Sequence, residues 1–198
     1  MLRVLTAGIA GTVLAACALR PGAGPGQPAA VPAASWGARL ASLQIAGEWQ
    51  LEGRVAVAFG TQGWQATLNR RQAGALSDVR LAGPLGIGAV VLQKTADGIS
   101  LNGAPASGPA LLELEQRLGF TLPLDELRFW LLGVPAPGTT FDLSLNEQDR
   151  AQSLDQAGWS VTFEQYLPAG GDLLPSRLIL SHAPVRVRIA VDRWQAAP

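Results

Sequence analysis

Residues 184–194 read Pro-Val-Arg-Val-Arg-Ile-Ala-Val-Asp-Arg-Trp, and this stretch decides the fold. Every second residue is apolar, and these residues are Val185, Val187, Ile189 and Val191. The residues between them are polar or small, and they are Arg186, Arg188, Ala190 and Asp192. Side chains alternate between the two faces of a β-strand, so the pattern predicts an antiparallel strand with one face in the core and the other in water.

The same alternation occurs far away in the chain, in residues 49–59. Shorter alternating segments bounded by turn residues predict further strands at 64–69, 76–82, 87–93, 99–101, 140–145, 151–155, 159–166 and 174–181. About ten or eleven strands with helices between them predict a mainly β fold, in which a large curved antiparallel sheet closes toward a barrel and helices cover one opening or face.

Helical spacing of apolar residues separates some of these strands. Ser35 can cap a short helix that carries Trp36 and Leu40 on one stripe. Further helices are predicted over 110–118 and over 124–132, where glycine or Gly-x-Pro follows each one.

The N-terminus has the pattern of an export signal. Arg3 precedes an apolar run over residues 4–16, which is too short to span a bilayer because a span takes about 20 residues. The tetrad Leu14-Ala15-Ala16-Cys17 resembles the bacterial lipobox, which implies cleavage before Cys17 and a covalent lipid on this cysteine. Ala18 after the cysteine implies delivery to the outer membrane, facing the periplasm, by the sorting rule of enteric lipoproteins.

The segment after Cys17 is rich in proline, glycine and alanine and has no apolar period, so it cannot pack into a core. We therefore expect a chain in three parts: a signal peptide over 1–16, a lipidated cysteine with a disordered tether over 17–35, and a folded domain over 36–198.

Composition excludes several classes of partner and chemistry. The 15 Lys and Arg residues balance 15 Asp and Glu residues, which argues against a nucleic-acid partner because phosphate binding needs a surplus of positive charge. We interpret the Arg70-Arg71 pair and the stripe of Arg186, Arg188 and Arg193 as solvated strand faces. A single cysteine forbids an intrachain disulfide, and a single histidine, His182, excludes a two-histidine metal site.

Catalytic motifs are also missing from the sequence. It contains no Gly-x-Ser-x-Gly elbow, and Lys94-Thr95 follows Gln93 where a phosphate loop needs glycine. Acidic pairs such as Glu113 with Glu115, or Asp125 with Glu126, are more typical of solvated helix faces and helix N-termini. We therefore expect a binding protein, no enzyme activity and no cofactor apart from the lipid on Cys17.

One predicted turn has an unusual composition. Residues 81–88 place Leu85 at the tip of a turn made by Gly83, Pro84 and Gly86, although turns are usually polar. An exposed leucine there favours a bilayer or an apolar partner. The alternative is that Leu85 packs into the core, and the pattern alone does not separate the two.

A series of short motifs occurs in order along the chain: Trp49-x-Leu51-x-Gly53-Arg54, Gly63-Trp64, Gly83-Pro84-Leu85-Gly86, Leu122-Pro123, Leu127-Arg128-x-Trp130-Leu131-Leu132-Gly133-x-Pro135, Gln156-x-Gly158-Trp159-x-Val161, Tyr166, Leu174-Pro175 and Val191-Asp192-x-Trp194. Together with the lipobox and tether, this series resembles the LolB family of outer-membrane lipoprotein receptors. Members often have an aromatic residue at the end of the second strand, whereas this chain reads Asn69-Arg70-Arg71, which leaves the cavity lining there open.

The resemblance implies an incomplete eleven-stranded antiparallel barrel with a lid of short helices over an apolar cavity. It implies a receptor that accepts lipoproteins from the periplasmic carrier LolA by their acyl chains and inserts them into the inner leaflet of the outer membrane, without nucleotide. It also implies that Leu85, in its turn of Gly83, Pro84 and Gly86, enters the membrane lipid. We expect the receptor to be a monomer.

Strand parity then predicts which side chains face the barrel interior. The predicted acyl-chain cavity is lined by strand residues Val55, Val57, Phe59, Val161, Phe163, Leu178, Leu180, Val187 and Ile189, and by helix residues Leu127, Trp130 and Leu131. Three other readings remain open: a lipocalin-like carrier of free lipid, a structural outer-membrane lipoprotein whose barrel is filled by side chains, and, as the weakest, an enzyme on this scaffold. Composition alone favours the filled barrel.

Overall fold

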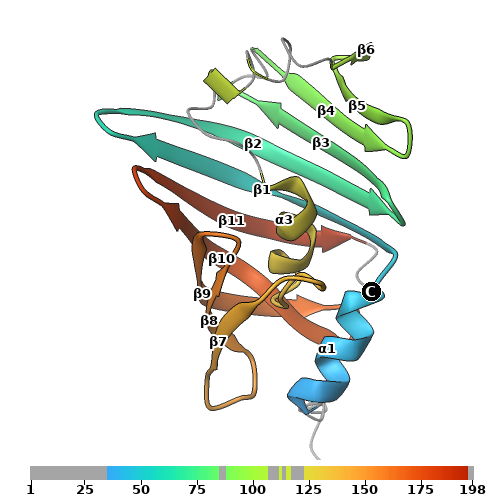
Figure 1. Cartoon of the computed structure of the whole chain (residues 1–198), viewed down its shortest axis with the longest axis vertical. Helices are drawn as coiled ribbons and strands as arrows, with labels where there is room; N and C mark the ends of the chain where they lie inside the picture. Colours follow the sequence, from blue (N-terminus) through green and yellow to red (C-terminus); the bar gives the residue numbers. More distant parts are fainter. Residues whose placement is uncertain (1–34, 85–87, 107–111, 113–114, 117–122, 196–198) are drawn as a thin grey trace, which may run out of the picture. The chain divides into compact units, whose positions relative to one another are not determined.

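The structure is a computed structural model that describes residues 35–84, 88–106, 112, 115–116 and 123–195 (Figure 1). The elements whose bounds lie in these ranges follow each other in this order: α1 (Trp36–Gln44), β1 (Glu48–Phe59), β2 (Gln62–Ala73), β3 (Leu76–Ala82), β4 (Val90–Thr95), β5 (Gly98–Leu101), β6 (Ala104–Pro105), α3 (Leu124–Trp130), β7 (Phe141–Leu145), β8 (Ala151–Gln156), β9 (Trp159–Ala169), β10 (Asp172–His182) and β11 (Val185–Gln195).

All eleven strands form one antiparallel sheet in the order β6-β5-β4-β3-β2-β1-β11-β10-β9-β8-β7. Each strand pairs with its neighbour in sequence, except where β1 pairs with β11 and joins two meanders at the middle of the sheet. Strands β6 and β7 are the two edges and do not pair in the described part of the chain, so the sheet is open there. The predicted mainly β fold with a large open antiparallel sheet is confirmed.

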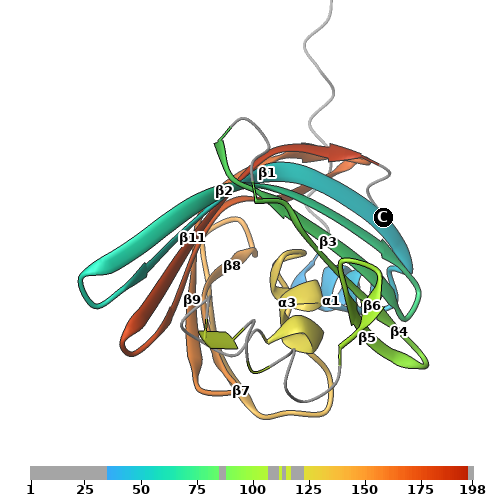
Figure 2. The ribbon, with the colours of Figure 1, turned by 90° about the horizontal axis from the view of Figure 1, so that it is seen from above.

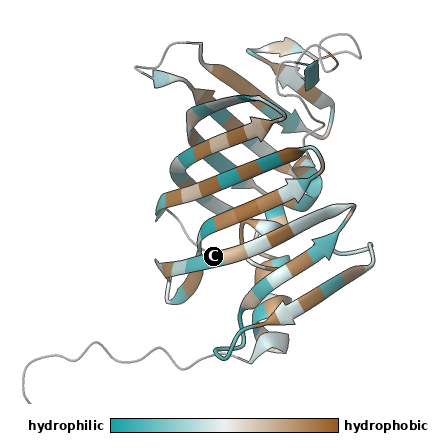
Figure 3. Ribbon diagram, turned by 90° about the vertical axis from the view of Figure 1, so that its left-hand side faces the viewer, coloured by the Kyte–Doolittle hydropathy of each residue, from teal (hydrophilic) through white to brown (hydrophobic). Residues whose placement is uncertain are grey.

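The sheet curves around α3, which lies against its concave side (Figure 2). Apolar and polar residues alternate along the strands, as the hydropathy colours show in Figure 3. In β11 the valines at 185, 187 and 191 and Ile189 are buried, whereas Arg186 and Arg188 are exposed. The parity predicted from residues 184–194 is therefore confirmed, and the concave face carries the core.

Helix α1 is attached to the sheet by a buried arginine. Arg39 is 4% exposed, donates a hydrogen bond to the carboxylate of Asp172, and donates another to the carbonyl oxygen of Leu173 at 2.5 Å. The helix begins after Ser35, as expected, but the Ser35 side chain makes no capping hydrogen bond. Its N-terminal position is instead fixed by packing and by Arg39.

Several boundaries differ from those predicted. Strand β2 is longer than 64–69, because its polar half continues the ladder beside β1 and β3. Strand β4 begins at Val90 rather than at residue 87, and the turn residue Gly88 has a φ of 69° that does not fit a strand. The helix predicted over 110–118 lies mostly outside the described residues.

Candidate functional site

A small apolar cavity lies between the concave face of the sheet and the N-terminal half of α3. Its volume is about 60 Å³. Strands β1, β2, β3, β9, β10 and β11 contribute to its wall, and Pro123, Leu124 and Leu127 close it from the side of the helix. Its lining has no polar accessible surface, so it offers contact to a hydrocarbon without specific hydrogen bonds.

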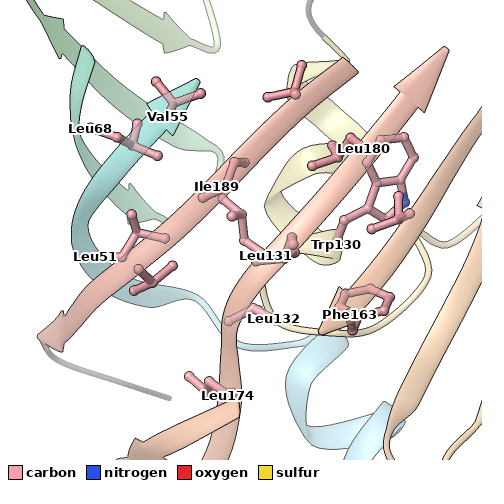
Figure 4. Close-up of a cluster of buried hydrophobic side chains, with 14 of the residues drawn as sticks. Leu51, Val55, Leu68, Trp130, Leu131, Leu132, Phe163, Leu174, Leu180 and Ile189 are labelled. Atoms are coloured by element: carbon pink, nitrogen blue, oxygen red, sulfur yellow. The ribbon is translucent and has the colours of Figure 1, made fainter. Parts of the chain in front are cut away.

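Half of the predicted lining residues are at this cavity, and they are Val55, Val57, Leu127, Leu180, Val187 and Ile189. Another group is buried in the adjoining core rather than at the cavity wall, and it comprises Trp130, Leu131, Val161, Phe163 and Leu178. Figure 4 shows how Leu180, Ile189 and Trp130 belong to the same cluster of apolar side chains. Phe59 is 38% exposed, because it lies at the last position of β1.

The sequence reasoning missed several lining residues, and they are Trp64, Leu68, Val79, Leu81, Pro123, Leu124 and Trp159. The signal for Leu68, Val79 and Leu81 was present, since each lies on the inward parity of a predicted strand. A parity argument applied to every strand would have found these three residues.

The C-terminal end of α3 is held by a buried glutamine. Gln156 Oε1 accepts hydrogen bonds from Trp130 Nε1 at 2.9 Å and from the Ala136 backbone N–H at 2.8 Å. Its Nε2 donates to the Ala136 carbonyl oxygen at 2.8 Å and to Thr139 Oγ1 at 2.6 Å. Residues 130–136 are all buried, so one end of the helix is fixed to the sheet.

Gly133 shapes this fixed segment. Its φ is 79°, and a Cβ placed on it would lie 3.0 Å from Pro175 Cγ and 3.6 Å from the Tyr166 hydroxyl. Tyr166 donates from that hydroxyl to the Ala151 carbonyl oxygen, and burial raises the pKa of Tyr166 above its usual range. The backbone can therefore approach β9 and β10 only without a side chain at 133.

Arg70 corrects one sequence interpretation. We expected Arg70 and Arg71 on a solvated face, but Arg70 is 1% exposed. It lies on the inward face of β2, two residues after the inward-facing Leu68. Its guanidinium carbon lies 5.4 Å from the ring centre of Trp49, and Nη2 makes long hydrogen bonds to the Leu124 carbonyl oxygen at 3.3 Å and to Gln72 at 3.4 Å. Among the described residues, its Nε and Nη1 have no hydrogen-bond partner.

Burial lowers the pKa of Arg70 to about 9, with repulsion from Arg128 acting in the same direction and Asp125 opposing it. The side chain therefore keeps its charge at neutral pH although it is buried, which costs free energy unless its donors are paired. This cation lies beside the carbonyl group of Leu124, so it lies at the N-terminal end of α3, where the cavity also lies.

Two predicted features fall partly or wholly outside the described residues. Gly83 and Pro84 follow directly after β3, with Pro84 exposed, while Leu85 and Gly86 lie outside the described part. Cys17 and the tether also lie outside it. His182 is described: its Nδ1 lies 2.8 Å from the Gly158 carbonyl oxygen and its ring stacks on Trp159, as a structural residue would.

Within the described ranges, no cluster of three or more His, Cys, Asp or Glu residues could hold a metal ion. None of the helices described is long and apolar enough to cross a bilayer.

An open antiparallel sheet that curves around a short helix and keeps an apolar space beneath it defines the fold class of this chain. A LolA superfamily protein from Nitrosomonas europaea has this fold, with a TM-score of 0.53 at 11% identity over 83% of this chain and 94% of that one. The family model described as outer membrane lipoprotein LolB matches residues 47–194. The chain belongs to the LolB family.

Relatives named outer-membrane lipoprotein LolB support this membership. The protein of Nitrosococcus oceani is 35% identical over 85% of this chain and 86% of its own length. That of Pseudomonas putida is 37% identical over 81% and 80%, and that of Alkalilimnicola ehrlichii is 31% identical over 99% and 98%. The family assignment suggested by the motifs is confirmed, and it places the chain among the lipoproteins of the outer membrane.

Proposed function

We propose that the chain is an outer-membrane receptor that accepts lipoproteins from a LolA-like periplasmic carrier and inserts them into the inner leaflet of the outer membrane. The apolar cavity beneath α3 carries the proposal, because an all-apolar lining can hold acyl chains of many clients without reading their protein parts. Membership of the LolB family supports it independently.

The chemistry of the cargo requires such a direct route. Three acyl chains of about 16 carbons, at about 0.8 kcal/mol per methylene, would cost on the order of 40 kcal/mol to expose to water. Release into solution is therefore not a usable step. The chains pass from one apolar surface to the next by differential affinity, so the receptor works as a binding protein, without enzyme activity, nucleotide or cofactor.

The cavity must enlarge to perform this function. Its volume of about 60 Å³ is far below that of ordinary ligand pockets, which are about 300–1,000 Å³. The enlargement takes place at the N-terminal half of α3, where Leu124 and Leu127 are only half-buried and Arg70 is poorly paired. The fixed end at Gln156 stays in place while the helix moves away from β2.

The remaining expectations complete this proposal. A lipid on Cys17 anchors the receptor, the segment over 17–35 is the tether, and the protein acts as a monomer. Leu85 enters membrane lipid during release of the cargo. The small cavity is also the one observation that favours a structural lipoprotein with a filled barrel, so the experiments must separate these two functions.

Photo-crosslinking from the cavity tests the function directly. A photoreactive residue in place of Val57, which is 4% exposed at the cavity wall, should capture acylated lipoproteins in cells. The matched control is the neighbouring Ala56, which is exposed on the other face of the same strand. Capture from both positions, or from neither, would contradict binding of acyl chains in the cavity and favour the filled barrel.

Membrane delivery is tested at the turn after β3. Leu85→Glu should leave folding and acceptance from the carrier nearly unchanged but block insertion into liposomes, since a charge at that position costs about 2–4 kcal/mol in hydrocarbon. Leu76→Glu is the control, because Leu76 is another exposed leucine, at 50%, at the opposite end of β3. A large loss of stability in Leu85→Glu would instead place this side chain in the core.

A further inference from the structure

A hollow larger than the apolar cavity is a groove on the opposite, outer face of the sheet. Its volume is about 670 Å³, it is open to solvent, and both charged and apolar residues line it. We define the groove by its basic residues, Arg54, Arg177, Arg186 and Arg188, which come from β1, β10 and β11.

The groove exists because small residues separate the arginines. In the register of the sheet, Arg188 lies between Ala56 of β1 and Ile179 of β10, and Ala190 lies between Arg54 and Arg177. Alanine side chains do not fill the space that the longer arginines enclose. Gly83 and Pro84, which follow β3, form part of the rim.

The charges of the groove are largely unbalanced. Arg54 is paired, since its Nη2 and Nε bind the Asp192 carboxylate at 2.7 and 3.2 Å. Arg177, Arg186 and Arg188 are exposed, and in the described part of the chain none of them forms an ion pair. The remaining acidic residue that lines the groove is Glu164 of β9. Three free guanidinium groups therefore face one carboxylate in a chain whose formal net charge is zero.

We propose that this groove binds the phosphate headgroups of anionic phospholipids at the membrane surface. Guanidinium groups pair well with phosphate oxygens, and several of them close together are attracted to an anionic lipid surface. The occupant follows from the surroundings of the protein: a lipoprotein of the outer membrane stays close to a phospholipid surface. The site orients the domain on the membrane, and it needs neither the apolar cavity nor its cargo.

The test uses the mature lipidated chain in vesicles and reports how close the groove comes to the headgroups. A fluorophore is attached at Thr162→Cys, which is exposed beside Ile179 at the border of the groove. Headgroup nitroxide lipids quench it. The parent chain, labelled in parallel, reports any reaction at Cys17, the only native cysteine. Vesicles of neutral lipids are compared with vesicles in which phosphatidylglycerol replaces part of the neutral lipid.

We expect phosphatidylglycerol to increase quenching, and high salt to remove the increase. Replacing both Arg186 and Arg188 by glutamine should lower the preference for anionic over neutral headgroups by about 25-fold, because each arginine at an anionic surface contributes about a fivefold preference. The control replaces Arg71 and Arg80, which are exposed on the same sheet face outside the groove, and should keep the increase.

Equal quenching in neutral and anionic vesicles, or equal loss in both double variants, would overturn the proposal. So would an effect of the groove variants that occurs only when a carrier protein is added, because this would make the groove a protein-binding surface. Crosslinking from Val57 should be unchanged in the Arg186 and Arg188 variant, so failure of the acyl-chain function and failure of the groove are separate results.

Discussion

The two ends of α3 are held by the sheet in different ways. At the C-terminal end, Trp130 and Leu131 are fully buried, and Gln156 makes hydrogen bonds to the Trp130 indole N–H and to both backbone groups of Ala136. At the N-terminal end, Leu124 and Leu127 are half-buried over a cavity, and Arg70 keeps two nitrogen atoms without partners. The comparison teaches that the two ends of one short helix have different roles. The tightly packed C-terminal end stabilises the fold, and the loosely packed N-terminal end can move to make space for a ligand.

The strongest way to break this comparison is to remove the glutamine. Gln156→Leu leaves the Trp130 indole N–H and both backbone groups of Ala136 buried without partners. We expect the free energy of unfolding to fall by about 3–5 kcal/mol, since each unpaired buried group costs about 1–3 kcal/mol. Chemical denaturation measures the change. Gln152→Leu is the control, because Gln152 is exposed on the same strand; equal losses would remove the special role of Gln156.

Two leucines of the helix region test the contrast directly. Leu131→Ala should cost about 2–5 kcal/mol, the usual range for a buried leucine, because Leu131 is 0% exposed. Leu127→Ala should cost about 1 kcal/mol, since its side chain is half-buried and already borders a void. Thermal and urea unfolding of the two variants give the difference. Similar values would mean that both ends of the helix are packed equally well.

Gly133 tests how closely the fixed end is packed. Gly133→Ala should lower the unfolding free energy by about 1–3 kcal/mol, because the new Cβ meets Pro175 Cγ at 3.0 Å in a backbone with φ of 79°. Gly138→Ala is the control, with φ of 83° and no atom within 4 Å of the Cβ. The difference between the two variants measures the contact itself. No difference would show that the segment can shift away from β10.

The smallest expected effect concerns the loosely held end. Arg70→Met removes a buried cation that has two nitrogen atoms without hydrogen-bond partners in the described structure, and it keeps an unbranched side chain, so we expect the unfolding free energy to stay constant or rise by about 1 kcal/mol. Arg71→Met, on the exposed face of the same strand, should change nothing. A loss of several kcal/mol in Arg70→Met would show that Arg70 stabilises the closed helix and that the two ends are alike.

The sequence predicted the parts of the fold where the pattern is long. Strands β1 and β11 alternate without interruption, so their existence, parity and buried face could be predicted. Strand β6 could not, because the two residues Ala104 and Pro105 carry no period. Motifs identified the family, since their order along the chain is more specific than any single one.

The cavity was harder to predict than the fold. Parity placed Val55, Val57 and Ile189 correctly, but the volume beneath α3 depends on how side chains pack, which no period encodes. Arg70 was misplaced because arginine is rarely buried, and this expectation was given more weight than its inward parity next to Leu68. Gln156 is part of a family motif, but its structural role could not be predicted, because its partners come from a segment 17 to 26 residues away in the chain.

The place of β11 in the sheet has a consequence for how the protein is made. The last strand of the chain does not extend an edge but joins β1 to β10 in the middle of the sheet. Both meanders can begin to form from neighbours in sequence, while the pairing of β1 with β11 must close a loop of more than a hundred residues and is expected to be slow. A chain that stops short of residue 185 would therefore lose the strand that joins the two halves of the sheet. Two separate half-sheets would remain, and the edges of β1 and β10 that normally pair with β11 would be unpaired.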